Sequence, residues 1–173
     1  MKQLPTIHLR ALEPEDLDLL YRIENNDVLW RVGATNVPYS SYVLRDYIAN
    51  TRSDIYADRQ LRLMIEDSEH AVVGILDLVN FDPRHLRAEV GIVICDDHRR
   101  QYFATAAIRE LCRYARETLH LHQLYVIVDV ENQPALQLFH HAGFQKESTL
   151  HDWLYADSGY HDAVLMQTFF EKI

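Results

Sequence analysis

The sequence predicts an α/β fold in which a mixed sheet carries helices on both faces. Three observations predict it. Short β-runs alternate with helical segments along the whole chain. Residues 88–95 are almost continuously apolar, which is typical of a strand buried on both faces. Residues 103–117 repeat apolar side chains every three or four positions, the spacing of an amphipathic helix.

The N-terminal quarter of the chain is predicted to hold one strand and two helices. Residues 7–10 alternate as a strand does. Pro14 and its acidic neighbours open a helix, because proline and carboxylates both suit a first turn, and the helix ends at residues 25–26. Residues 27–40 are predicted to be irregular. Ser40 then caps a second helix.

The rest of the chain is predicted to be rich in strands. Runs at 61–65, 71–79 and 88–95 precede the long helix, and a run at 124–130 follows it. A helix led by Asn132 comes next, and then two β-runs around a hairpin turn at 157–159. With no linker or repeat, the 173 residues are predicted to form one domain, 1–173.

Composition excludes some classes of function. The formal net charge of −9 argues against general nucleic-acid binding, which needs a basic face. It suits a cationic small molecule such as a polyamine, although a solubilising acidic surface accounts for most of those charges. Cys95 and Cys112 match no metal-ligand spacing and favour a reducing, cytoplasmic setting. No signal peptide or membrane segment is expected.

The turn between the strand at 88–95 and the long helix predicts a phosphate site. Such a turn leaves unpaired amides at the positive end of a helix dipole, which suits a pyrophosphate. The residues assigned to this site are Arg99, Arg100, Gln101, Tyr102, Phe103, Ala104 and Thr105.

Several motifs carry a resemblance to a known family. They are residues 9–17, Arg87-Ala88-Glu89, residues 124–129, Asn132-x-x-Ala135 through Gly143-Phe144, and Tyr160-His161-Asp162-Ala163-Val164. With these motifs the chain resembles the GCN5-related N-acetyltransferases (GNAT), and most of all the spermidine N-acetyltransferases. The resemblance implies acetyl-CoA as acetyl donor, an amine as acceptor and a homo-oligomer. It also implies a mostly antiparallel sheet that splays between its fourth strand, 88–95, and its fifth, 124–130.

The resemblance also implies roles for individual residues. Main-chain groups of Ile92, Val93 and Ile94 would pair with the pantetheine arm, and Asn132 would lie near it. Gly91 would permit a bulge in the fourth strand. Glu89 would take the proton of the amine, directly or through water. The alternative is that Glu89 is a structural partner of Arg87 or Arg84.

Three departures from the family pattern bear on activity. Tyr102 stands where the phosphate turn has glycine, and its ring either leans away or plugs the turn. Phe139 stands where a tyrosine protonates the departing thiolate, and losing such an acid costs about 10²–10⁴-fold. A water or Tyr125 remains as an alternative donor. Residues 32–38 lack the carboxylates of the polyamine regulatory site, so none is expected here.

Three functions therefore stay open. The first is an acetyl-CoA-dependent N-acetyltransferase for a small primary amine, such as the polyamine spermidine. The second is an N-terminal protein acetyltransferase of the ribosomal-protein type. The third, suggested by Tyr102 and Phe139 together, is a degenerate GNAT that binds CoA without turnover or serves as a structural or regulatory module. In the first function Phe139 merely packs near the sulfur. No metal is expected, because His120-x-His122 and His140-His141 form no recognised ligand set.

Overall fold

The computed structural model describes residues 4–30, 37–156 and 158–170. In these residues seven strands form one sheet with the order β1-β2-β3-β4-β5-β7-β6. The parallel pair β4–β5 is flanked by antiparallel neighbours on both sides. The strands are β1 His8–Ala11, β2 Leu61–Glu66, β3 Val72–Asp82, β4 Arg87–Ile94, β5 Gln123–Asp129, β6 Gln145–Ala156 and β7 Gly159–Phe169. The predicted fold class is confirmed; one domain over residues 1–173 stays a prediction.

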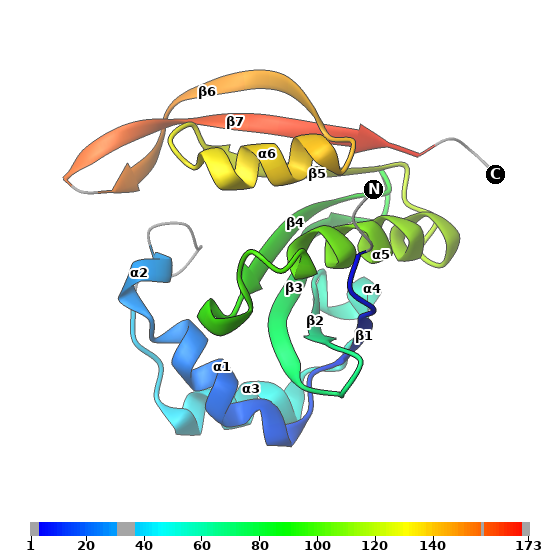
Figure 1. Ribbon diagram of the computed structural model, residues 1–173, viewed down its shortest axis with the longest axis vertical. Coiled ribbons are helices and arrows are strands. Elements are labelled where there is room, and N and C mark those ends of the chain that lie inside the picture. Colours follow the sequence, from blue (N-terminus) through cyan, green and yellow to red (C-terminus); the bar gives the residue numbers. More distant parts are fainter. Residues whose placement is uncertain (1–3, 31–36, 157, 171–173) are drawn as a thin grey trace.

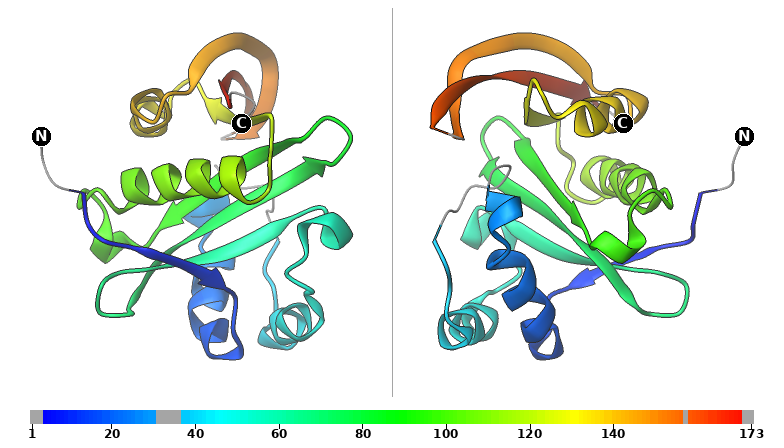
Figure 2. Two further views of the ribbon diagram at one scale, coloured as in Figure 1. Left: turned by 90° about the vertical axis from the view of Figure 1, so that its right-hand side faces the viewer. Right: turned by 60° about the vertical axis from the view of Figure 1, so that its left-hand side comes forward.

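Helices cover both faces of the sheet, as Figures 1 and 2 show. The described helices are η1 Pro14–Asp16, α1 Leu17–Glu24, α2 Asp27–Trp30, α3 Ser41–Asn50, α4 Ile55–Asp58, η2 Asp96–His98, α5 Phe103–Glu117 and α6 Gln133–His141. Leu20 of α1 and Leu44 of α3 pack against Met64 and Ile75 on one face. The other face is buried under α5 and α6. Among the described helices, none combines the length and apolar character needed to cross a membrane.

The α5 helix follows directly from its apolar spacing. Phe103, Ala107, Leu111 and Ala115 are buried, and they share one side of the helix because they lie four residues apart. The opposite side carries charged residues such as Arg113, which pairs with Glu110. The predicted bounds, 103–117, match the observed ones.

The sheet opens between β4 and β5. The two strands pair only through Arg87–Gln123, Ala88–Leu124 and Glu89–Tyr125. Beyond this point β4 continues beside β3, and β5 continues beside β7. The predicted splay is therefore confirmed, and the Glu89–Tyr125 pair marks its apex.

Two details of the prediction are wrong. Residues 27–40 include the helix α2, and α4 was not foreseen; helices of four residues are too short to show a periodic pattern. Gly91 makes no bulge, because it stays in register with Asp77. The irregularity lies between Val79 and Asp82, where Asn80 takes a left-handed conformation with φ 51°. Asparagine tolerates this conformation better than most residues.

Arginine-centred ion pairs fasten the N-terminal helices to the sheet. The guanidinium of Arg62 on β2 donates to Glu24 at 2.6 Å and to Asp77 at 2.8 Å. Arg10 on β1 donates two hydrogen bonds to the buried carboxylate of Asp16, at 2.7 and 2.9 Å. These bonds orient η1 and α1 over the sheet.

Candidate active site

The phosphate turn keeps a glycine-like backbone without glycine. Arg100 has φ 61° and Tyr102 has φ 67°, both in the left-handed region. A residue with a Cβ pays about 1–2 kcal/mol for this conformation. The Tyr102 residue is 46% exposed, so it lies at the surface. The two alternatives for its ring, leaning away from the turn or plugging it, stay predictions.

The N-terminus of α5 offers hydrogen-bond donors. In the part of the chain that the structure describes, the amides of Phe103, Ala104 and Thr105 donate to no protein acceptor, and the Ala106 amide is the first to do so, to the carbonyl of Tyr102 at 3.0 Å. Helix geometry leaves such amides unpaired at the positive end of the dipole. The turn thus presents several convergent donors.

Side chains around this turn are arranged by local bonds. The guanidinium of Arg99 pairs with Asp96 at 2.9 Å and also donates to the Ile94 carbonyl at 3.3 Å. The side-chain amide of Gln101 donates to the main-chain carbonyl of Asp97 at 2.9 Å. Arg100 is exposed at the surface. Within the described residues, the Nδ1 atom of His98 is buried and makes no hydrogen bond.

Strand alternation decides which main-chain groups face the gap. The Cys95 amide donates to the Val73 carbonyl on β3 at 2.9 Å. Because main-chain groups of successive residues in an antiparallel strand point to opposite edges, those of Val93 also point to β3. Those of Ile92 and Ile94 point to the gap. Two of the three residues predicted to hold the pantetheine arm therefore offer it their main chain.

Asn132 and Phe139 lie on α6. The side-chain Oδ1 atom of Asn132 accepts a hydrogen bond from the Ala135 amide at 3.2 Å, so this side chain caps the helix. Phe139 is 3% exposed, and its ring packs edge-on against Phe144 with ring centroids 5.2 Å apart. A phenyl ring here supplies packing and no proton.

Glu89 and Asn80 meet on the other face of the sheet. The Asn80 side-chain amide donates to the Glu89 carboxylate at 2.8 Å. Arg87 instead pairs with Asp82 at 3.3 Å, and the main-chain amide of Arg84 donates to the same Asp82 at 3.0 Å. The alternative that Glu89 pairs with Arg87 is therefore wrong. Arg87 bonds across the β3–β4 turn because its position is near that turn.

Tyr125 completes this cluster. Tyr125 is the strand neighbour of Glu89, and burial of its ring together with the negative charge of Glu89 raises the pKa of Tyr125 above its ordinary value. Sequence reasoning raised Tyr125 only as a substitute donor and missed Asn80. The single local signal for Asn80 is that asparagine tolerates a left-handed backbone, and this signal does not name a partner.

A GNAT acetyltransferase domain model matches residues 6–145. The chain belongs to the GNAT acetyltransferase family. It is 29% identical over 173 residues to spermidine N(1)-acetyltransferase of Escherichia coli, covering 98% of this chain and 89% of that protein. It is 31% identical over 165 residues to "Putative ribosomal N-acetyltransferase YdaF" of Bacillus subtilis, covering 91% of this chain and 88% of that protein.

Solved structures agree with this assignment. The structure of spermidine N-acetyltransferase from Vibrio cholerae in complex with CoA and spermine superposes with a TM-score of 0.83 at 28% identity, covering 94% of this chain and 95% of that one. A dodecameric structure of the Vibrio cholerae enzyme in an intermediate state superposes with a TM-score of 0.80 at 28% identity, covering 94% of this chain and 93% of that one. The chain is an acetyltransferase with acetyl-CoA as its donor.

The residues of this GNAT acetyltransferase fit that donor. The unpaired amides of residues 103–105 can donate to the oxygens of a diphosphate. The buried Nδ1 atom of His98, close to them in sequence, makes no hydrogen bond within the described residues and can take a partner from the bound coenzyme. The edge of β4 at Ile92 and Ile94 has peptide groups of the kind that pair with the amides of pantetheine. Exposed arginines 99 and 100 add positive charge at the same place.

The Glu89–Tyr125 cluster lies on the opposite face of the sheet from α6. Val126 and Val128 of β5 are buried among the side chains under α5 and α6. Side chains alternate along a strand, so Tyr125 and Asp129 point to the face on which α1 and α3 pack. The donor's turn and the carboxylate thus approach the apex of the gap from different sides.

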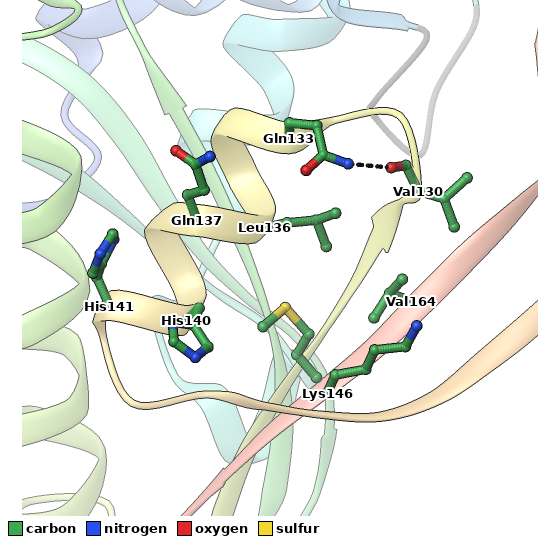
Figure 3. Close-up of a pocket in the computed structure, with 9 residues that line it drawn as sticks. Val130, Gln133, Leu136, Gln137, His140, His141, Lys146 and Val164 are labelled. Carbon is green, nitrogen blue, oxygen red and sulfur yellow. Dashed lines mark hydrogen bonds between the residues drawn. The ribbon is translucent and has the colours of Figure 1, made fainter.

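A pocket of about 370 Å³ lies beside α6 and contains none of the predicted site residues. Figure 3 shows Leu136 of α6, Val164 of β7 and Val130, the residue after β5, around it, with Lys146 of β6 beside them. Gln133 closes one end by donating to the Val130 carbonyl at 2.9 Å. Val164 pairs with the buried Val128, so this pocket is on the α6 face and the sheet separates it from Glu89.

One group of described side chains has the composition of a metal site. Ligand atoms of Asp129, Glu131 and His161 all lie within 4.8 Å of one another. The His161 Nδ1 atom is 3.7 Å from each carboxylate, an arrangement that ion pairing explains by itself. None of the histidine pairs considered from the sequence contributes to it. We assign no metal to this group.

Proposed function

We propose that this GNAT acetyltransferase transfers an acetyl group to a primary amine of a polyamine, with spermidine as the reference substrate. The observation that carries the proposal is the Glu89 carboxylate, held by Asn80 at 2.8 Å at the apex of the β4–β5 gap. A half-buried carboxylate at this point attracts an ammonium group and can accept its proton. The relatives named for spermidine support the choice of amine.

The residues of the chain divide the work in the proposed reaction. The amides of residues 103–105 hold the diphosphate, and the edge of β4 at Ile92 and Ile94 holds the pantetheine arm. Bound acetyl-CoA supplies the activated acetyl group. Glu89, directly or through water, removes a proton from the ammonium group, so that the neutral nitrogen can attack the acetyl carbon.

We further propose that the protein is a homo-oligomer and acts in the cytoplasm. A dodecameric relative supports the first point. Cys95 and Cys112 are both free thiols, which supports a reducing setting. Light scattering after size-exclusion chromatography measures the oligomer directly, and a monomeric mass at micromolar concentration would contradict it.

The activity is tested by following free thiol when the protein, acetyl-CoA and an acceptor are mixed. The acceptors are spermidine, spermine, and peptides with the N-termini of ribosomal proteins. Turnover with polyamines is the expected result. Glu89→Gln should lower kcat/KM by about 10²-fold or more. The matched control is Glu69→Gln, an exposed residue of the β2–β3 turn, which should leave the rate unchanged.

Two other outcomes identify the alternative functions. The 31% identity to the Bacillus subtilis protein favours ribosomal N-termini as the second candidate, and turnover with peptides alone would establish it. A rise in melting temperature with CoA but no thiol release with any acceptor would establish a degenerate GNAT.

A further inference from the structure

We propose that Tyr125 is the residue that donates a proton to the sulfur of the departing coenzyme. This inference rests on the proposed acetyl transfer, and it adds a catalytic residue that takes over the task for which Phe139 has no hydroxyl. Glu89 and Tyr125 then form one unit that moves a proton from the amine to the thiolate.

The position of Tyr125 fits the reach of the coenzyme. Glu89 and Tyr125 form the last pair before β4 and β5 part. From Glu89 to Ile94, next to the phosphate turn, β4 runs for five residues, which is about 16 Å at the rise of a strand. An extended pantetheine arm has this length. With its diphosphate on the α5 amides, the thioester therefore reaches the apex.

Phe139 does not compete for this role. Its ring is buried against Phe144 and has no ionisable group. The phenol of Tyr125 is half-buried beside the carboxylate that receives the amine's proton. Donor and acceptor of the two proton transfers are thus neighbours across the β4–β5 pair.

The electrostatics of the pair change during the reaction. Burial and the negative charge of Glu89 both raise the pKa of Tyr125, so the phenol keeps its proton at neutral pH. When Glu89 takes up the proton of the amine, that negative charge disappears. The phenol then becomes a stronger acid at the stage when the sulfur leaves. Asn80 holds Glu89 in place throughout.

The step balances as follows. The neutral amine nitrogen forms a bond to the acetyl carbon while the bond from that carbon to sulfur breaks, and the sulfur keeps the electron pair. Tyr125 gives its phenolic proton to this sulfur. The ammonium proton that Glu89 removed before the attack has by then passed to bulk water, so Glu89 is ionised again. The second proton, which the nitrogen loses as the amide forms, passes to Glu89 and from Glu89 to the phenolate. The products are the N-acetylated amine and CoA with a free thiol, and both side chains return to their starting states.

Three variants test the assignment with whichever acceptor the wild type uses. Tyr125→Phe should lower kcat by about 10²-fold, while the CoA dissociation constant measured by calorimetry stays unchanged. Adding Phe139→Tyr to Tyr125→Phe gives a double variant. Its kcat should be at least tenfold higher than that of Tyr125→Phe alone, because the new hydroxyl can protonate the sulfur. The control is Tyr114→Phe, which removes a half-buried phenol of α5 and should leave kcat unchanged. Wild-type kcat in Tyr125→Phe, or a loss that the double variant does not restore, would overturn the proposal.

A second measurement needs no turnover. Ultraviolet absorbance is followed against pH for the wild type and for Tyr125→Phe, both without coenzyme. The difference between the two curves reports the ionisation of the Tyr125 phenol alone. The same difference taken in the Glu89→Gln background should show the phenol ionising at lower pH. An unshifted titration would overturn the coupled pair. This result stands apart from the proposed function, because a protein that acetylates no acceptor can still pass or fail it.

Discussion

Phe139 and Phe144 pack edge-to-face, with an angle of 69° between rings whose centroids lie 5.2 Å apart. This contact closes the C-terminal end of α6 onto β6 and leaves little space around the Phe139 ring, which is 3% exposed. Phe139, one of the departures from the family pattern, is thus part of the core.

Phe139→Tyr should therefore destabilise the protein in the absence of CoA. A buried hydroxyl without a partner costs about 1–3 kcal/mol, and urea unfolding measures that loss. In the wild-type background kcat should change little, because Tyr125 already supplies the proton. A large increase in kcat would show that thiolate protonation limits the natural enzyme and that Tyr125 does not perform it.

Tyr102→Gly should stabilise the protein by about 0.5–1 kcal/mol, since relief of the left-handed strain exceeds the added entropy of the unfolded chain. Tyr102→Ala keeps the strain and should gain nothing. Both variants should bind CoA as the wild type does, because amides and not the ring hold the phosphates. Calorimetric titration checks this. Weaker binding by both variants would show that the ring contacts the coenzyme.

Asn80→Gly should keep the backbone, because glycine adopts φ 51° without strain. It removes the amide that orients Glu89, so we expect kcat to fall about tenfold with the KM for acetyl-CoA unchanged. Asn80→Asp also tolerates this backbone but places a second negative charge beside Glu89, and its kcat should fall further. If the KM values for acetyl-CoA and for the amine rose equally while kcat stayed normal, that result would contradict a positioning role.

Asp16→Asn should cost about 2 kcal/mol of stability near neutral pH, through loss of charged hydrogen bonds. Burial alone would raise the pKa of Asp16, but the Arg10 hydrogen bonds and the Glu13 amide outweigh it and hold that pKa below the ordinary value. The contribution of the carboxylate is present above the unfolded-state pKa of about 3.9. It disappears as the pH falls through the lower folded-state pKa.

Urea unfolding between pH 2 and 8 measures this difference between Asp16→Asn and the wild type. The exposed Asp18→Asn variant serves as the control and should follow the wild type at every pH. A difference that stays constant down to the lowest pH would contradict the ionic origin of the effect.

Local patterns predicted much of the architecture. The α5 helix was predicted with its correct bounds because its apolar spacing is long and regular. Ser40 was recognised as a cap from its residue type, and its hydroxyl does accept from the Val43 amide at 3.2 Å. The gap beside β4 came from the family resemblance, since apolar strands do not reveal where two of them part.

The site was less predictable because its key contacts join distant segments. Asn80 and Glu89 meet only because β3 and β4 pair with an irregular register. The sequence around Tyr102 does not predict a left-handed backbone there, because aromatic residues rarely adopt that conformation. The surrounding turn and the α5 helix impose that conformation.

The narrow join between β4 and β5 gives the molecule a seam. Three residue pairs join β4 to β5, and beyond these pairs none of the described strands lies between the two edges. A molecule bound along this seam can form hydrogen bonds to the strand edges, in place of the strand pairing that stops there. Deuterium uptake at Ile92 and Ile94 should consequently slow when CoA is added, making the loaded protein a stiffer body than the empty one.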